Sequence, residues 1–267
     1  MPVKSEFDVV IVGGGMVGAA LAASLAPTKL SILVLDAESP ATADTAAPTT
    51  VDSVEPRVSA LTCATQTLLV NIGAWQHLPP ARICAYERME VWDADGTGAV
   101  HFNAAETGTV ALGWIVENRQ VAAALHAACA ERSNIEWRAP VRLQSLLRNG
   151  NRWQIATADG NTVSARLLVG ADGAQSQVRE LLEFRTRRHD YQHRAIVATV
   201  QTEWSHDACA RQRFIDTGPL AFLPLAGESE KLCSVVWSTT PDETQRLLAL
   251  DDQSFASEIG HALEDRL

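Results

Sequence analysis

The sequence lacks any apolar run that approaches the roughly 20 residues needed to cross a bilayer. Its first residues, Met1–Glu6, also lack a charged leader followed by a long apolar segment. Basic residues are outnumbered, with 22 Lys and Arg against 32 Asp and Glu and a formal net charge of −10. Nonspecific affinity for nucleic acid depends on clustered cations. We therefore expect a cytoplasmic protein that binds no nucleic acid and has at most peripheral contact with the inner membrane.

Cysteine is scarce, and its pattern excludes two further classes of protein. The five cysteines include no CxxC pair, and an odd number suits a reducing compartment better than a disulfide framework. The histidines lack metal-ligand spacing, and no arrangement for nucleophilic catalysis is visible. We predict neither a metal site nor a catalytic side chain. The short basic cluster Arg185–His189 is interpreted as a solvated loop, with a phosphate or lipid-headgroup patch as the alternative.

What is present begins with a strand, a glycine-rich turn and a helix. Phe7–Val12 is short, β-branched and bounded by glycine, as is typical of a buried parallel strand. Gly13 permits a tight turn, Gly15 lets the backbone approach a pyrophosphate, and Gly18 allows close contact between the helix and the strand. The free N–H groups and the dipole of the following helix, which includes Ala19–Ala26, favour an anion without any basic side chain.

A second strand and a second glycine motif extend this pattern. Ser31–Leu35 ends in Asp36, at the spacing expected for a carboxylate that accepts hydrogen bonds from an adenosine ribose. The order predicts a dinucleotide site, although FAD and NAD share this fingerprint. Gly170–Gly173, which contains Asp172 and Gly173, follows another apolar run. Together the two motifs indicate a flavin.

The remaining chain predicts two kinds of sheet. Ala37–Pro56 is interpreted as a long loop, mobile without ligand. Three strands form an antiparallel meander inserted into a parallel α/β domain, at Val141–Leu147, Trp153–Thr157 and Val163–Val169. After Phe184, further strands and a helix from Asp242 predict a separate antiparallel sheet. Those strands are Ala195–Thr202, Arg211–Ile215, Leu220–Leu225 and Leu232–Thr239.

The expected architecture is therefore α/β, with a Rossmann-like FAD-binding domain over residues 1–184 and an α+β substrate domain with an antiparallel sheet over residues 185–267. The tryptophans that fall within strands are interpreted as packing residues rather than stacking platforms. They are Trp92, Trp137, Trp153 and Trp237.

At the level of longer motifs, the chain resembles a known family over essentially its whole length: the flavin-dependent aromatic hydroxylases of the UbiH/UbiF/VisC group, most of all the VisC (UbiI) branch. Members hydroxylate prenylated phenols during ubiquinone biosynthesis. The blocks that carry the resemblance are Asp8–Gly18, Glu55–Leu61, Ile72–Trp75, Met89–Asp93, Ile115–Asn118, Leu168–Arg179, Asp190–His193, Leu220–Pro224 and Ser234–Trp237.

The resemblance implies FAD as cofactor, NAD(P)H as transient electron donor, and O2 and a prenylated phenol as substrates. The first glycines and Asp36 would hold the ADP half of FAD, and Asp172–Gly173 would contact both FAD and NAD(P)H. Arg57 matches an arginine near the flavin, with a loop-ordering ion pair as the alternative. Asn118 matches a flavin-contacting residue, with a helix N-cap as the alternative.

The resemblance also implies an apolar aromatic pocket at Phe222, Leu223 and Pro224, with core packing as the alternative. In the family, the pattern continues past a segment like Leu248–Leu267 into a further strand and a Gly-Asp-Ala-Ala-His-type motif. Weak or no FAD binding is therefore expected of these 267 residues alone. The alternatives are another flavin-linked reductase, dehydrogenase or halogenase of this fold, or a non-catalytic subunit that docks with other ubiquinone-biosynthesis proteins.

Overall fold

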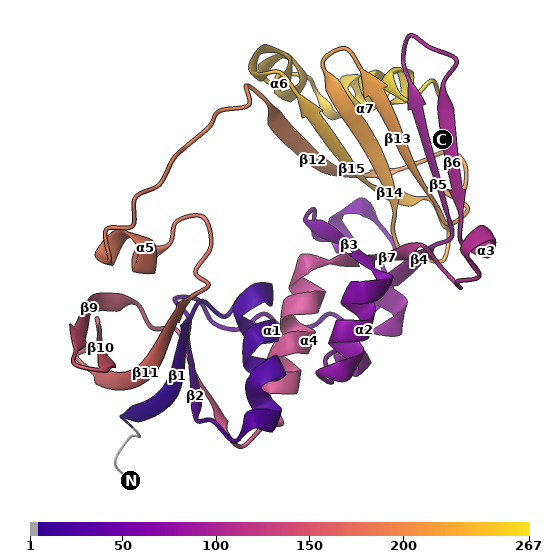
Figure 1. The fold of residues 1–267 in the computed structure, drawn as a ribbon. Helices are drawn as coiled ribbons and strands as arrows, with labels where there is room; N and C mark the ends of the chain where they lie inside the picture. The colour runs from indigo at the N-terminus through magenta and orange to yellow at the C-terminus, as the bar shows by residue number, and fades with distance from the viewer. Residues whose placement is uncertain (1–4) are drawn as a thin grey trace. The chain divides into compact units, whose positions relative to one another are not determined.

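A computed structural model describes residues 5–267, and the chain forms two compact units (Figure 1). Unit 1 consists of the described part of Met1–Ala43, together with Thr67–Leu78 and Arg119–Arg187. Unit 2 consists of Asp44–Gln66, Pro79–Asn118 and Arg188–Leu267. Two segments from the first half of the chain thus fold with the C-terminal part. The predicted division into FAD-binding and substrate domains assigns functions to the two parts and stays a prediction.

Unit 1 is built on a six-stranded sheet with the order β8-β2-β1-β11-β10-β9. Its elements are β1 (Glu6–Val12), α1 (Met16–Leu25), η1 (Ala26–Thr28), β2 (Ile32–Leu35), the second part of α2 (Cys63–Asn71), η3 (Trp75–His77), α4 (Asn118–Ala130, from its second residue), β8 (Ile135–Arg138), β9 (Leu143–Asn149), β10 (Arg152–Thr157), β11 (Thr162–Gly170) and α5 (Gln177–Leu181).

The unit 1 sheet combines parallel and antiparallel strands as predicted. β8, β2, β1 and β11 are parallel, whereas β11, β10 and β9 form the antiparallel meander. The short, fully buried strand β2 has apolar residues on both faces, as expected of a parallel strand covered on both sides. Helices α1 and α4 lie side by side, with the Cys129 sulfur 3.5 Å from the Ala19 carbonyl oxygen (Figure 1).

Unit 2 contains a six-stranded sheet with the order β12-β15-β14-β13-β5-β6 and a three-stranded sheet with the order β3-β7-β4. Its elements are η2 (Val51–Ser53), β3 (Val58–Thr62), the start of α2, η4 (Pro80–Arg82), β4 (Ile83–Tyr86), β5 (Arg88–Asp93), β6 (Ala99–Asn103), α3 (Ala104–Thr107), β7 (Gly113–Glu117), β12 (Arg194–Gln201), β13 (Cys209–Ile215), β14 (Gly218–Pro224), β15 (Leu232–Thr239), α6 (Pro241–Leu248) and α7 (Asp252–Ala262).

The large sheet of unit 2 departs from the prediction in one respect. Its four C-terminal strands pair antiparallel as expected, but β13 pairs in parallel with β5, so the β5–β6 hairpin from the middle of the chain extends the sheet. This pairing joins segments more than 100 residues apart, and local sequence patterns carry no information about such a contact.

Helices α6 and α7 cover one face of this sheet (Figure 1). Because side chains alternate between the two faces of a strand, one residue set packs beneath the helices and the other points away from them. Trp92 and Trp237 belong to the covered set, which confirms their predicted packing role. The buried members of that cluster are Trp92, Ile196, Leu220, Phe222, Cys233, Val235, Trp237, Leu247, Ile259 and Leu263.

One buried polar residue in unit 2 bears on stability. His206, which is 3% exposed, accepts a hydrogen bond from the Ala208 N–H at Nδ1 (3.1 Å), while Nε2 lies 3.0 Å from the Leu225 carbonyl oxygen. This arrangement requires a neutral imidazole with its proton on Nε2.

Within residues 5–267, no helix has both the length and the apolar character that a membrane span requires.

Candidate cofactor-binding site

The two glycine motifs meet at one edge of the unit 1 sheet. β1 and β11 are parallel neighbours, with Val12 opposite Gly170, so the turns that follow both strands begin side by side. The Ala171 N–H donates to the Val12 carbonyl oxygen (2.7 Å), and the Gly13 N–H donates to the Leu35 carbonyl oxygen (2.8 Å). The carboxyl edge of a parallel sheet is where α/β proteins bind their ligands.

The three predicted glycines meet different surroundings. Gly13 has a φ of +101°, and a Cβ on Gly18 would lie 1.9 Å from the Gly13 carbonyl oxygen. Both positions therefore require glycine for the fold itself, which agrees with the predicted tight turn and close helix contact. A Cβ on Gly15 would have no atom within 4 Å. Gly15 is thus not needed for packing, and the space beside it is open to a ligand.

The N-terminus of α1 suits a diphosphate. Gly15 is the N-cap residue and has no side chain that could bind the first N–H groups of the helix, and the first turn contains no acidic residue. The first turn of a helix leaves backbone N–H groups without partners inside the helix, and its dipole favours negative charge. The open space at Gly15 and these donors together fit the diphosphate of a dinucleotide.

Asp36 is half-buried and accepts hydrogen bonds from two backbone groups. The Gly14 N–H donates to Oδ2 (2.7 Å), and the Glu38 N–H donates to Oδ1 (3.0 Å). Asp36 therefore fixes the glycine turn, while each carboxylate oxygen keeps a lone pair that can accept a ribose hydroxyl.

Sequence reasoning missed the part that Trp137 has in this turn. A Cβ on Gly14 would lie 2.2 Å from Cζ2 of Trp137, so the indole occupies the space that a side chain there would need. Trp137 reaches this position because β8 pairs with β2, placing Trp137 opposite Val34. Its ring also packs edge-on against His126, with the ring centroids 4.8 Å apart. The pairing is tertiary, and the sequence offered no signal for it.

Asp172 accepts hydrogen bonds from residues of its own turn and of the helix that follows. Ser176 Oγ donates to Oδ1 (2.6 Å), and the Val178 N–H donates to Oδ2 (3.1 Å), so Asp172 holds the start of α5. Gly173 has a φ of +74°, and a Cβ there would have no atom within 4 Å. The turn thus presents a backbone open to close approach, while the carboxylate serves the fold.

Arg57 and Asn118 lie together in unit 2. The Asn118 N–H donates to the Arg57 carbonyl oxygen (2.9 Å), and Ser59 Oγ donates to Asn118 Oδ1 (2.6 Å). The Arg57 side chain is exposed and forms no hydrogen bond or ion pair with any residue of 5–267. The structure therefore brings the glycines, Asp36 and Asp172 together in unit 1, and Arg57 and Asn118 together in unit 2.

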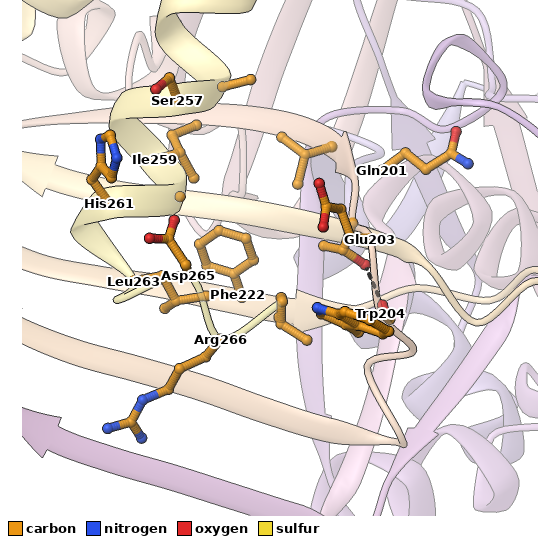
Figure 2. Close-up of a pocket in the computed structure, with 15 residues that line it drawn as sticks. Gln201, Glu203, Trp204, Phe222, Ser257, Ile259, His261, Leu263, Asp265 and Arg266 are labelled. Atoms are coloured by element: carbon orange, nitrogen blue, oxygen red, sulfur yellow. Dashed lines mark hydrogen bonds between the residues drawn. The ribbon is translucent and has the colours of Figure 1, made fainter.

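The three residues predicted to line a pocket, 222–224, do not share one face, because consecutive residues of β14 point to opposite sides of the sheet. Phe222 packs beneath α6 and α7, whereas Leu223 packs on the other side with Val54, Cys84 and Ile115. Phe222 borders a cavity of about 460 Å³ between the sheet and α7. Figure 2 shows Phe222 on the strand side of this cavity and Ile259 and His261 on the helix side.

Comparisons with known proteins agree with this architecture. Residues 6–265 match a family described as an FAD binding domain. The ubiquinone biosynthesis monooxygenase COQ6 of Xenopus tropicalis is 34% identical, with 96% of this chain and 56% of the relative covered. The ubiquinone hydroxylase UbiL of Rhodospirillum rubrum is 36% identical (97% and 58% covered), and the 3-demethoxyubiquinol 3-hydroxylase of Escherichia coli K12 is 33% identical (97% and 64% covered).

The chain thus spans 56–64% of the length of these curated relatives. Among solved structures, PqsL of P. aeruginosa shares the fold, with a TM-score of 0.74, 20% identity and coverage of 97% of this chain and 71% of that one. The p-nitrophenol 4-monooxygenase PnpA of Pseudomonas putida shares it with a TM-score of 0.71, 19% identity and coverage of 92% and 62%.

The resemblance to ubiquinone-biosynthesis hydroxylases that the sequence predicted is confirmed by these relatives. Because the family match extends over almost the whole chain, this protein belongs to the family of FAD-binding domains, and FAD is its cofactor.

Proposed function

We propose that this chain acts in a monooxygenase that hydroxylates the aromatic ring of a prenylated phenol in ubiquinone biosynthesis, with NAD(P)H as electron donor and O2 as oxidant. The observation that carries the proposal is the pair of glycine turns at one sheet edge, beside the open N-terminus of α1. Relatives named as ubiquinone monooxygenases and hydroxylases, at 33–36% identity, support the choice of reaction.

In this proposal, the protein's part is to bind and orient. The N–H groups at the start of α1 bind the diphosphate of FAD beside Gly15, and Asp36 accepts hydrogen bonds from the adenosine ribose. The exposed Arg57 guanidinium supplies a cation for the pyrophosphate or for electron-rich states of the ring system. When bound, FAD supplies the redox chemistry that transfers one oxygen atom from O2 to the phenol.

The face of the unit 2 sheet that points away from α6 and α7 supports an apolar substrate. Directly paired residues point to the same side of a sheet, and the row that faces away from α6 and α7 is apolar except for one glutamine. Its members are Val197, Val236, Ala221, Gln212, Val91 and Val100. Leu223 lies on this face and is only partly buried by its packing with Val54, Cys84 and Ile115. Of the three residues predicted for the pocket, we therefore retain Leu223 as the substrate contact.

The test is to titrate the 267-residue chain with FAD, follow the flavin absorbance spectrum, and assay it at saturating FAD with NAD(P)H and a prenylated phenol. We expect weak FAD binding, NAD(P)H oxidation and O2 consumption stimulated by the phenol, and a product heavier by one oxygen atom. A reductase or dehydrogenase would oxidise NAD(P)H without incorporating oxygen, and a halogenase would give a halogenated product. Either result would contradict the proposed reaction.

Contacts with a membrane surface and with other ubiquinone-biosynthesis proteins stay predictions from the resemblance.

A further inference from the structure

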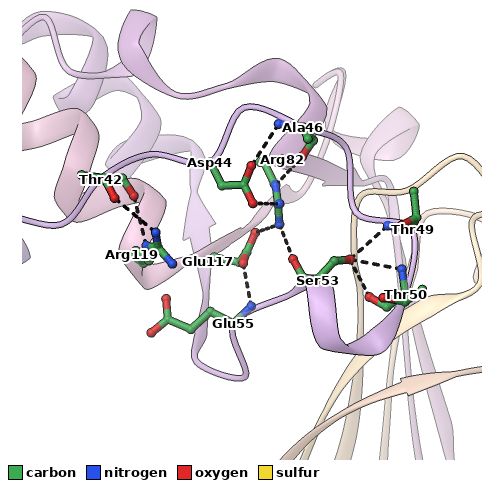
Figure 3. A network of polar contacts seen from close by, with 10 residues as sticks. All are labelled: Thr42, Asp44, Ala46, Thr49, Thr50, Ser53, Glu55, Arg82, Glu117 and Arg119. Atoms are coloured by element: carbon green, nitrogen blue, oxygen red, sulfur yellow. Dashed lines mark hydrogen bonds and ion pairs between the residues drawn. The ribbon is translucent and has the colours of Figure 1, made fainter.

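Unit 2 contains an arginine whose charge is almost fully removed from solvent. Arg82, at the end of η4, is 3% exposed. Its Nη1 donates to Glu117 Oε1 (2.9 Å) and to the Ser53 carbonyl oxygen (2.7 Å), and its Nε donates to the Ala46 carbonyl oxygen (2.6 Å). Its Nη2 pairs with Asp44. Figure 3 shows these acceptors surrounding the guanidinium.

The network satisfies all three guanidinium nitrogens and both oxygens of a buried carboxylate. Glu117 is 5% exposed, and its Oε2 accepts a hydrogen bond from the Glu55 N–H (2.7 Å). A buried charge is tolerated only when it is paired and hydrogen-bonded, and removal of one partner leaves the other uncompensated. Arg82 and Glu117 therefore depend on each other, and both bind the segment 44–55.

This segment leads directly into Arg57. Glu55, held by Glu117, stands two residues before Arg57, and the next residue, Val58, pairs with Glu117 between β3 and β7. The Arg57 carbonyl oxygen accepts from the Asn118 N–H (2.9 Å). The backbone on both sides of Arg57 is thus fixed by residues 117 and 118, and Glu117 is in turn held by Arg82.

We propose that Arg82 is a positioning residue for Arg57. By anchoring segment 44–55 and holding the Glu117 carboxylate, Arg82 fixes the backbone from which the Arg57 guanidinium reaches FAD. The inference rests on the proposed function, in which Arg57 binds FAD. Its physical basis is preorganisation: an arginine whose backbone is already fixed loses less conformational freedom when the ligand binds. The sequence predicted that residues 37–56 form a loop that is mobile without ligand. The hydrogen bonds of Arg82 and Glu117 to segment 44–55 oppose this motion.

The experiment is a double-mutant cycle on FAD affinity, measured by flavin fluorescence titration of the 267-residue chain. The variants are Arg82→Met, Arg57→Gln and the double variant, with Arg246→Met as the matched control. Arg246 is an exposed arginine of unit 2 that pairs with Glu243 and Glu258. We expect Arg82→Met to raise the FAD Kd about tenfold, Arg57→Gln to raise it at least as much, and the control to leave it unchanged.

The double variant decides the proposal. If Arg82 acts through Arg57, the double variant binds FAD no more weakly than Arg57→Gln alone, because the positioned group is already gone. Losses that multiply, or an Arg82 variant with unchanged affinity, would overturn the positioning role. Arg82→Lys keeps a cation beside Glu117 but lacks the planar fork, so it completes the same cycle if Arg82→Met does not fold.

A second measurement is independent of FAD. Amide hydrogen exchange at Glu55 should accelerate in Arg82→Met and Arg82→Lys, while amides of β14 and β15 keep their protection. Unchanged exchange at Glu55 would overturn the proposal even if affinity changed. Absence of FAD binding by the unmodified chain would instead contradict the proposed function, and the positioning role would fall with it. FAD binding with multiplying losses would overturn the positioning role alone.

Discussion

Replacement of two glycines in the same turn by alanine should separate folding from cofactor binding. In Gly18→Ala, the new Cβ would lie 1.9 Å from the Gly13 carbonyl oxygen, whereas real Cβ atoms stay beyond 3.0 Å, so helix and turn must separate by about 1.1 Å. Overpacking of this kind costs roughly 1–3 kcal/mol, and the higher helix propensity of alanine returns about 1 kcal/mol. Because both clashing groups are tied to the backbone, we expect a cost in the upper half of this range and a net loss of about 1–2 kcal/mol.

Gly15→Ala should behave in the opposite way. Gly15 has an ordinary φ of −64°, and a Cβ there meets no atom within 4 Å, so alanine fits without strain. Alanine reduces the flexibility of the unfolded chain, which stabilises the folded protein, but it is a poorer N-cap residue than glycine, which destabilises it. Each effect is below about 1 kcal/mol, and the two oppose each other. Stability should therefore stay nearly unchanged. The added methyl group occupies the space proposed for the diphosphate, so FAD affinity should fall at least about tenfold.

Thermal unfolding and FAD titration of both variants test this pair. Each kcal/mol lost should lower the unfolding midpoint by about 2–4 °C in a chain of this size. We expect a lower midpoint for Gly18→Ala, and an unchanged midpoint with weakened FAD binding for Gly15→Ala. If Gly15→Ala bound FAD as tightly as the unmodified chain, the diphosphate would not lie at this turn. Equal destabilisation by both variants would refute the packing argument.

Three further predictions concern stability and reactivity. A thiol-specific reagent should label Cys63 rapidly in the folded protein and the other four cysteines only after unfolding. Those four are buried, and burial raises the pKa of each thiol, to about 12 for Cys84 and Cys233. Fast labelling of a second thiol would contradict the fold. Burial lowers the pKa of His206, although the Leu225 hydrogen bond and nearby acidic groups oppose the shift, so the unfolded chain binds a proton that the folded chain does not. The free energy of unfolding should thus fall as pH drops below about 6.5, by at most about 1.4 kcal/mol per pH unit. Denaturant unfolding over a pH series checks this, because the free energy of unfolding of His206→Gln should depend less on pH than that of the unmodified chain. Asp172→Ala should destabilise unit 1 by about 1–2 kcal/mol through loss of both hydrogen bonds to the start of α5, measured by denaturant unfolding; an unchanged midpoint would mean that these bonds are absent in solution.

Local patterns predicted the elements that carry the site. Neighbouring residues specify the first strand, the glycine turn, the helix, the second strand and the acid that follows it. The sequence therefore predicted Gly13, Gly18 and Asp36 together with the elements on which they lie. The meander and the four C-terminal strands were likewise predicted from apolar runs and turn residues. These patterns did not predict that the hairpin of β5 and β6 joins the unit 2 sheet, because β5 pairs in parallel with β13, a strand far away in the sequence.

By itself, the sequence determined which segments form strands and helices and where a dinucleotide motif stands, because backbone preferences and side-chain periodicity act over a few residues. Only the tertiary structure decided that the two glycine turns share an edge, that Phe222 and Leu223 face opposite sides, and that Arg82 joins Glu117 to segment 44–55. Those facts arise from strand pairing and burial between residues distant in the chain. The free energy of such contacts depends on the three-dimensional arrangement of both partners, so it cannot be predicted from the local sequence of either one.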